Sequence, residues 1–243
     1  MLVFNCITLN FKKHKMNKRL LALVFFVAIV GSTQSQNGVE LEKEKMKQAL
    51  AYGDKNVAIS KMYDIIALQG ATSVYKDSLA YLYFNNREYL SCFLVTNDVL
   101  ERKPANIEIL EMNTVSLESI GAKAKAAEGY EKLMSKSNRA YHAYKLAGLY
   151  LETNKLEEAY TAIKKANTLP DEEDLSISFK VNANYNQDVK LKPAIAYLEG
   201  IIAVQLKKNA EATIAFKRAV QLFPEFVLAK TQLSSLEEEA AKE

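Results

Sequence analysis

The residues that could carry out chemistry are few. The chain of 243 residues holds two histidines, His14 and His142, and two cysteines, Cys6 and Cys92. Nucleophilic catalysis needs a nucleophile with a base beside it, and no partner motif accompanies His142. We interpret His142 as a residue of a helix surface or groove edge, and Cys92 as a buried, inert thiol. The sequence therefore predicts no enzymatic activity and no catalytic residue.

No cofactor or metal site is predicted either. So few histidines and cysteines exclude a His-rich metal site, a zinc ribbon and a disulfide framework. The sequence also lacks a Gly-rich phosphate loop, Gly-x-Ser-x-Gly and His-Glu-x-x-His. The acidic runs at 171–174 and 237–239 lack the spaced ligands of a calcium loop, so we interpret them as solvated surface.

The positive charge of the chain is concentrated at its beginning. The formal net charge is +3, and residues 1–35 contain five basic residues and no acidic one. Removing these five from the 32 basic residues leaves 27 basic against 29 acidic residues in the rest. A nucleic-acid-binding protein would concentrate positive charge on its folded part, so we expect no nucleic-acid partner.

The first residues resemble an export signal. A basic stretch, Lys12–Arg19, precedes eleven apolar residues, Leu20–Val30, and a short run of small and polar residues. This order predicts a secretory signal peptide over residues 1–35, with Met16 as an alternative start. As a helix the apolar run spans about 16 Å, against about 30 Å of hydrocarbon core, which favours cleavage before Gln36 over anchoring. We expect an exported protein, periplasmic or secreted, with no stable membrane span after cleavage.

The remainder is helical in character and repeats with a period near 34 residues. The three clearest copies place small or aromatic residues at fixed intervals, and a proline follows the second helix of each. Small residues at these positions let two antiparallel helices approach closely. The matching positions are Gly200, Ala203, Ala212, Phe216, Ala219 and Pro224 in the clearest unit, Ala147, Tyr150, Ala159, Ile163, Ala166 and Pro170 in a second, and Ala80, Tyr83, Cys92, Thr96, Val99 and Pro104 in a third.

This spacing resembles the tetratricopeptide repeat (TPR), whose pattern is large-x-x-Leu-Gly-x-x-Tyr, then Ala-x-x-x-Phe-x-x-Ala, then Pro. The resemblance implies an all-α solenoid of helical hairpins over residues 39–241. An ordinary helical bundle is the alternative, although it would not place prolines and glycines at a fixed phase. Two weaker units carry Met46 and Thr114 at the small position. The expected repeats are residues 39–71, 73–104, 106–138, 140–170 and 193–224.

An extra segment separates the last two repeats. The small position advances by 53 residues there, 19 more than the usual step. Ser176–Val181 alternates polar and apolar residues, and residues 182–186 have turn-forming composition. These patterns predict a small β-hairpin insertion over residues 175–192, with a mobile loop as the alternative. Residues 225–241 are expected to form a C-terminal capping helix.

By the TPR resemblance, the first helix of each pair lines a concave groove. The groove would be aromatic and acidic, which favours a partner carrying Lys or Arg. About half of its tyrosines are expected to pack between repeats instead. The basic and Asn residues of the TPR carboxylate clamp have no match here. The predicted partner-binding residues are Tyr81, Phe84, Glu108, Glu111, Glu118, Tyr141, Tyr144 and Tyr197.

These features predict a non-catalytic protein–protein interaction scaffold in the periplasm or cell envelope, which binds a peptide segment or a partner domain in its concave groove. One alternative is a structural subunit of a cell-envelope assembly. Another is an accessory to an envelope enzyme or transporter. The sequence leaves open the partner, the process, the oligomeric state and whether the concave or the convex face binds.

Overall fold

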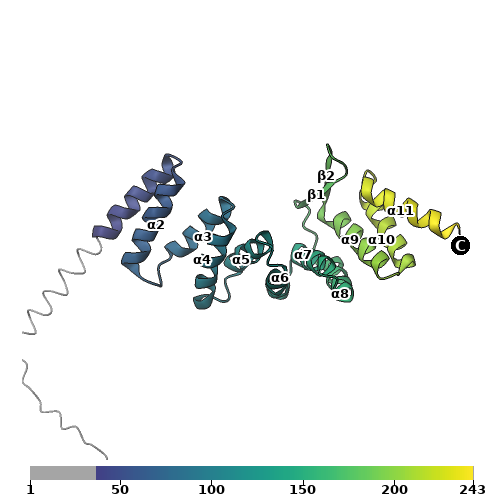
Figure 1. Cartoon of the computed structure of the whole chain (residues 1–243), viewed down its shortest axis with the longest axis horizontal. Helices are drawn as coiled ribbons and strands as arrows, with labels where there is room; N and C mark the ends of the chain where they lie inside the picture. Colours follow the sequence, from purple (N-terminus) through teal and green to yellow (C-terminus); the bar gives the residue numbers. More distant parts are fainter. Residues whose placement is uncertain (1–36, 243) are drawn as a thin grey trace, which may run out of the picture. The chain divides into compact units, whose positions relative to one another are not determined.

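A computed structural model describes residues 37–242, most of which belong to helices joined in hairpins by short turns (Figure 1). The predicted signal peptide lies outside the described residues. Among the described residues, no helix has the length and apolar character needed to cross a membrane. The chain forms two compact units, one ending at Tyr75 and the other beginning at Lys76.

The first unit contains a helical segment over residues 37–51 and helix α2 (Lys55–Gln69). The side chain of Asp54 accepts a hydrogen bond from the backbone N–H of Val57 at 3.0 Å, which caps the start of α2. The turn before α2 contains Gly53 at φ +73°, the left-handed conformation that glycine adopts without strain.

The second unit is a succession of helices in which each packs against the next from α4 onward. Its turns repeat one geometry, with a residue at positive φ between the two helices of a pair. That residue is Gly121 or Asn154 in two of the pairs, and Arg87 or Lys207, at φ +60° and +59°, in two others. The helices are α3 (Tyr75–Asn85), α4 (Tyr89–Arg102), α5 (Ile107–Ser119), α6 (Lys123–Ser137), α7 (Ala140–Glu152), α8 (Leu156–Thr168), α9 (Leu191–Gln205), α10 (Asn209–Leu222) and α11 (Val227–Ala240).

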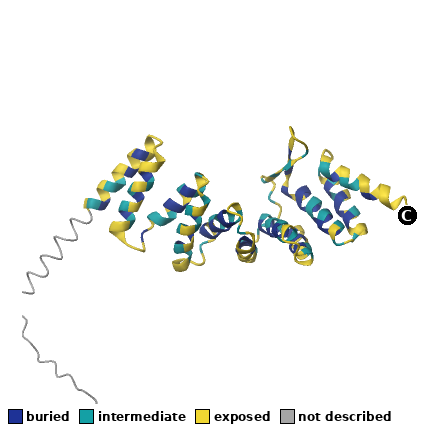
Figure 2. Cartoon of the chain, viewed as in Figure 1, coloured by how far each residue is buried: buried dark blue, intermediate teal, exposed yellow. Residues whose placement is uncertain are grey.

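Small residues line the contacts between paired helices, where Figure 2 shows buried positions in dark blue. Gly200 of α9 lies so close to Phe216 of α10 that an added Cβ would stand 2.6 Å from a ring carbon. In the α5–α6 pair, Thr114 occupies the position where the repeat prefers a small residue. Gly129 on α6 provides the space instead, because a Cβ there would lie 2.8 Å from the Thr114 methyl carbon. The other small contact residues, all fully buried, are Ala80, Cys92, Ala147, Ala159 and Ala212.

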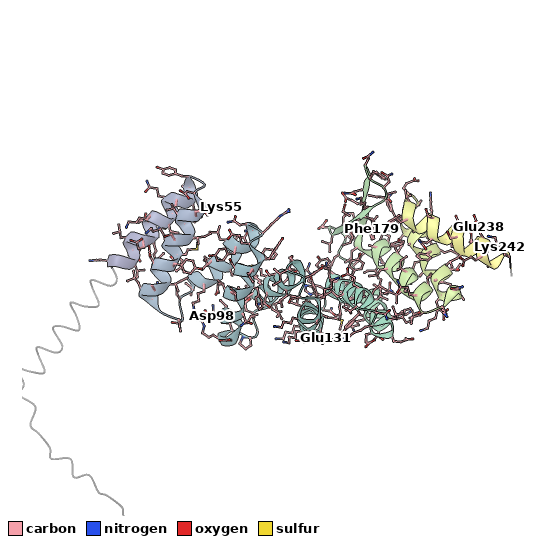
Figure 3. All side chains as sticks on the ribbon, in the orientation of Figure 1. Lys55, Asp98, Glu131, Phe179, Glu238 and Lys242 are labelled. Carbon is pink, nitrogen blue, oxygen red and sulfur yellow. The ribbon has the colours of Figure 1, made fainter. Side chains whose placement is uncertain are left out.

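A β-hairpin lies between α8 and α9, as predicted. Strands β1 (Ser176–Lys180) and β2 (Asn186–Lys190) are antiparallel, and Ile177 pairs with Val189. Its two faces also follow the prediction: Ile177, Phe179 and Val181 are half-buried, whereas Ser178 and Lys180 are exposed. An isolated two-stranded hairpin is marginally stable, so it needs packing against other elements. Phe179 (labelled in Figure 3) supplies this packing, with its ring centroid 5.4 Å from that of Tyr197.

Helix α11 covers the end of the helical array. Ala229 and Leu236 are buried on its inner face. The amide of Gln187 on β2 joins the hairpin to this helix. It donates to the carbonyl oxygen of Glu225 at 2.6 Å and accepts from the N–H of Val227 at 3.1 Å. The hairpin and the capping helix therefore support one another.

Candidate interaction surfaces

The aromatic residues predicted for the first-helix groove fall into two groups. On α3, Tyr81 is 62% exposed and Phe84 is half-buried, so both are accessible to a partner. Tyr144 packs against the cores on both sides of α7, and burial raises the pKa of its hydroxyl. The ring of Tyr197 lies 5.0 Å from that of Phe226. Tyr144 and Tyr197 therefore contribute to the packing between repeats.

The glutamates of the predicted groove are largely neutralised by basic groups of the same chain. Glu118 accepts hydrogen bonds from Lys145 Nζ at 2.5 Å and from the Tyr130 hydroxyl at 2.8 Å. Glu111 pairs with Arg139 Nη1 at 3.0 Å. Glu108 is exposed and has no ion pair among residues 37–242. The groove thus offers less negative charge to a basic partner than its composition suggests.

Tyr141 lies at the start of α7 in a contact that the sequence did not reveal. Glu172, from the loop before the hairpin, accepts the backbone N–H of Tyr141 at 2.9 Å and the Nε–H of Arg139 at 2.9 Å. A carboxylate at a helix N-terminus is stabilised by the helix dipole and by the free N–H groups there. The interpretation of the acidic run at residues 171–174 as solvated surface is therefore wrong for Glu172.

His142 is fully buried, so the expectation of a helix-surface or groove-edge position is wrong. Its Nδ1 lies 2.6 Å from Ser137 Oγ and its Nε2 lies 3.3 Å from Glu111 Oε1. The hydrogen bond to His142, with Arg139 nearby, holds the pKa of Glu111 below its usual value against desolvation. Ser137, His142 and Glu111 thus lie next to one another in this order, with the imidazole between the other two side chains. The imidazole has no exposed surface for a substrate, and we interpret the cluster as a link between α5, α6 and α7.

Cys92 lies in the α4 contact surface with no exposed area, as predicted. Burial raises the pKa of its thiol, which keeps it protonated and unreactive. Among the described residues, no group of three or more His, Cys, Asp or Glu side chains is placed to hold a metal ion.

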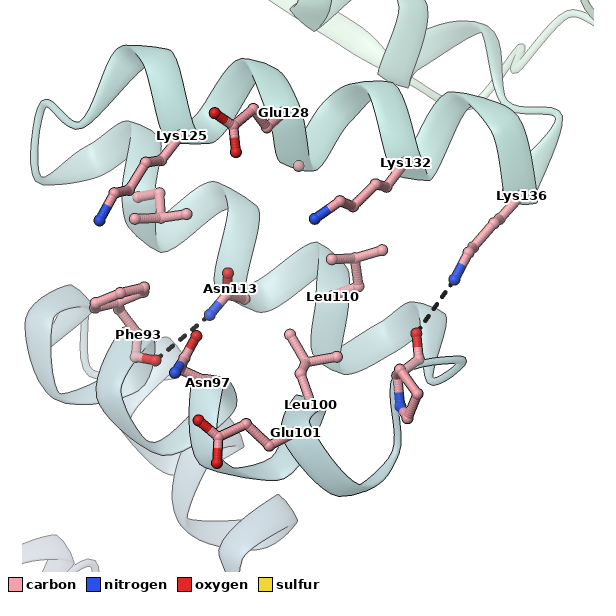
Figure 4. A pocket seen from close by; sticks show the side chains of 13 residues that line it. Phe93, Asn97, Leu100, Glu101, Leu110, Asn113, Lys125, Glu128, Lys132 and Lys136 are labelled. Carbon is pink, nitrogen blue, oxygen red and sulfur yellow. Dashed lines mark hydrogen bonds between the residues drawn. The ribbon is translucent and has the colours of Figure 1, made fainter.

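A pocket of about 680 Å³ opens between α4, α5 and α6 (Figure 4). Its floor is apolar and is built from Phe93, Leu100, Leu110 and Leu117. Its two walls are second helices of successive pairs, so it opens on the side away from the predicted first-helix groove. The polar residues at its rim are Asn97 and Glu101 on α4, and Lys125, Glu128, Lys132 and Lys136 on α6.

The sequence contains one signal for this pocket. Lys125, Lys132 and Lys136 recur at intervals of seven and four residues, which places them on one edge of a helix. The apolar floor gave no comparable signal, because leucines at helical spacing are usually ordinary core residues. Only the spacing between α4 and α6 shows that part of this floor stays uncovered.

A second pocket, of about 590 Å³, opens between α6, α7 and α8. Met134, Leu146 and Tyr150 form its apolar surface. Its rim is mainly acidic, with Glu131, Glu157 and Glu158 against Lys165. The Tyr150 hydroxyl donates a hydrogen bond to Glu131, and Lys208 pairs with Glu157 at 3.4 Å. The two pockets therefore carry opposite charge on the two sides of α6.

No family model matches the sequence, and no curated protein matches it at a significant level. Solved structures do match in three dimensions. YrrB, described as a TPR protein with an unusual peptide-binding site, gives a TM-score of 0.61 at 12% identity, over 81% of this chain and 96% of YrrB. MamA from Desulfovibrio magneticus RS-1 gives 0.58 at 16% identity, over 78% of this chain and 97% of MamA.

A further crystal structure of MamA gives a TM-score of 0.55 at 16% identity, over 67% of this chain and 85% of MamA. At identities this low, likeness in three dimensions shows the fold alone. The all-α fold predicted from the repeat is confirmed. This chain has a TPR-like solenoid of helical hairpins, with a small β-hairpin insertion and a C-terminal helix.

Proposed function

We propose that this protein is a non-catalytic scaffold that binds a segment of another protein. The observation that carries this proposal is the pocket between α4, α5 and α6, whose apolar floor stays uncovered. Apolar pockets with a few convergent polar groups are the usual form of binding sites. YrrB, which has the same fold, is described as having a peptide-binding site, and this supports the proposal by analogy.

The first-helix face is a second candidate surface of the same scaffold. Tyr81 is 62% exposed on α3, and Phe84 and Glu108 are accessible on the same series of first helices. An exposed tyrosine buries much area on binding for little loss of conformational entropy. The ring of Phe84 also packs edge-on against that of Tyr89, so Tyr81 is the most accessible aromatic residue of the three.

We further propose that the scaffold acts outside the cytoplasm, in the periplasm or after secretion. The order of basic, apolar and small residues over 12–36 supports this. The intact mass of the protein recovered from cells tests it. We expect the mass of a chain whose first residue is at or near Gln36. A mature protein that retains Leu20–Val30 would overturn the proposal.

The binding function is tested by quantitative co-purification after chemical crosslinking in cells. Three variants are compared with the parent: Leu100→Glu in the pocket, Tyr81→Ala on the first-helix face, and Leu94→Glu as a control. Leu94 is on the same helix as Leu100, but it is 60% exposed and does not line the pocket. We expect a partner that the parent and Leu94→Glu retain and that Leu100→Glu loses. The scaffold function is wrong if no protein exceeds the background, and both candidate surfaces are wrong if all four chains recover the same proteins.

A further inference from the structure

Building on the proposed scaffold function, we propose that the pocket between α4, α5 and α6 binds an extended peptide segment in which acidic residues alternate with apolar ones. Each part of this description rests on one feature of the pocket. These features are its length, its apolar floor, its basic wall and one amide oxygen without a donor.

The length of the pocket sets the length of the segment. Lys125 and Lys136 mark the two ends of the α6 wall (Figure 4). They are eleven residues apart, which is about 16 Å along a helix at roughly 1.5 Å per residue. An extended peptide advances about 3.3 Å per residue, so about five residues fill this distance. The ammonium of Lys136 donates to the carbonyl oxygen of Pro104 at 3.2 Å and closes one end of the pocket.

The floor requires apolar side chains. Leu110 and Leu117 are nearly buried, at 7% and 6% exposure, and form the base. Phe93 and Leu100 are half-buried and line the side formed by α4. A side chain that enters here exchanges water for carbon contacts on several sides, which is the arrangement that concentrates binding energy in a few residues.

The α6 wall favours acidic side chains. It carries three lysines and one glutamate, Glu128. Within residues 37–242, neither Lys125 nor Lys132 has an ion-pair partner, so their charges are available to a ligand. The acidic residue of the opposite wall, Glu101, repels carboxylates and so orients the segment with its acidic residues towards α6. Charges at a rim contribute mainly to association rate and selectivity.

The amide oxygen of Asn113 favours a ligand that carries a hydrogen-bond donor. Asn113 is 7% exposed, and its Nδ2 donates to Thr96 Oγ1 at 2.9 Å and to the Phe93 carbonyl at 3.4 Å. The Thr96 hydroxyl donates its own proton to the Cys92 carbonyl at 2.7 Å, so it can only accept from Asn113. This fixes the orientation of the amide and turns Asn113 Oδ1 towards the pocket (Figure 4).

No donor to Asn113 Oδ1 exists in the described part of the chain. A backbone N–H of an extended segment is such a donor, whereas the backbone N–H groups within a helix are already bonded. The amide therefore favours an extended ligand over a helical one. In an extended segment, alternate side chains point in opposite directions, so one set reaches the floor and the other reaches the rim.

The test is selection from a phage-displayed library of random twelve-residue peptides on the purified full chain. Peptides that also bind Leu100→Glu are removed, and Leu94→Glu must retain the remaining ones. A synthetic peptide with the selected consensus is then titrated by fluorescence anisotropy at low and high salt. The titrated proteins are the parent, Lys132→Glu and the control Lys230→Glu, whose lysine is exposed on α11. Circular dichroism confirms that each variant is folded.

We expect a consensus in which Asp or Glu alternates with Leu, Ile, Val or Phe. Lys132→Glu should weaken binding by about threefold to tenfold and flatten its salt dependence, while Lys230→Glu leaves both unchanged. A basic or uncharged consensus, or no peptide that depends on Leu100, overturns the inference. If the peptides bind Leu100→Glu as tightly as the parent and lose binding to Tyr81→Ala instead, the pocket is not the site, but the scaffold function stands.

Discussion

Replacing Gly200 with alanine should destabilise the last repeat, because the new methyl group has no room. The added Cβ would lie 2.6 and 2.7 Å from two ring carbons of Phe216, distances that real Cβ atoms essentially never show. The Phe216 ring is fully buried and stands 5.8 Å from that of Tyr197, so it has little freedom to move away. The clash therefore requires a shift of α9 against α10.

The magnitude follows from two opposing effects. Overpacking a closed core typically costs about 1–3 kcal/mol, and alanine is favoured over glycine inside a helix by about 1 kcal/mol. Gly148 on α7 is the matched control, because a Cβ there meets nothing within 4 Å. Gly148→Ala should therefore stabilise the protein by up to about 1 kcal/mol. Both variants replace a helical glycine with alanine and gain the same helix propensity. The difference between their free energies of unfolding therefore measures the clash alone, at about 1–3 kcal/mol.

Urea denaturation followed by circular dichroism measures both variants against the parent. We expect a lower midpoint for Gly200→Ala than for the parent, a higher one for Gly148→Ala, and unchanged slopes. If Gly200→Ala stabilises the protein as much as Gly148→Ala does, then α9 and α10 do not approach as closely as described and the reasoning is refuted.

Three further predictions concern other contacts of the same unit. Ala212 is fully buried, whereas Ile214 on the same helix is 66% exposed. Ala212→Glu should therefore cost about 3 kcal/mol or more of stability, while Ile214→Glu changes it by less than about 0.5 kcal/mol. Equal melting temperatures of the two variants would disprove this assignment of the buried and exposed faces of α10. Gln187→Ala should lose about 1–3 kcal/mol with its two hydrogen bonds to the start of α11, and Asp188→Ala, on the exposed face of β2, should lose almost none in the same melts. The pKa of Glu111 is lowered in the folded state, so its carboxylate stabilises the fold above its ordinary pKa of 4.5, and this stability is lost as the pH falls through its folded-state pKa. Between pH 6 and pH 3 the melting temperature of the parent should therefore fall more steeply than that of Glu111→Gln. Parallel profiles of the two proteins would exclude this contribution.

The features that could be predicted from the sequence depend on local patterns. The turn at Gly121 follows from the backbone preference of one residue. The two faces of the hairpin follow from alternation over six residues, because neighbouring side chains of a strand point in opposite directions. The use of Gly129 to accommodate Thr114 shows the limit of this reasoning. The pattern marks Thr114 as a poor fit, but the compensating glycine lies on a different helix.

The features that could not be predicted depend on contacts between distant residues. The buried position of His142 depends on the preceding helix pair, where Ser137 lies beside its Nδ1 and Glu111 beside its Nε2. Glu172 belongs to a run of four acidic residues, and the run does not show which of them meets the start of α7. The pocket has the same origin, because its volume depends on the separation of two helices that no local pattern encodes.

The most direct test of the interaction scaffold is residue-specific photocrosslinking in cells, with a photoreactive phenylalanine placed in turn at Asn97, Leu94 and Tyr81. Asn97 lies at the rim of the pocket, Leu94 is exposed one turn earlier on the same helix and does not line the pocket, and Tyr81 reports on the first-helix face. Mass spectrometry then identifies the crosslinked partner peptide. We predict a stronger crosslink from Asn97 than from Leu94, to a segment in which acidic and apolar residues alternate. A partner peptide that crosslinks from Tyr81 and not from Asn97 would contradict the assignment of the pocket as the binding site.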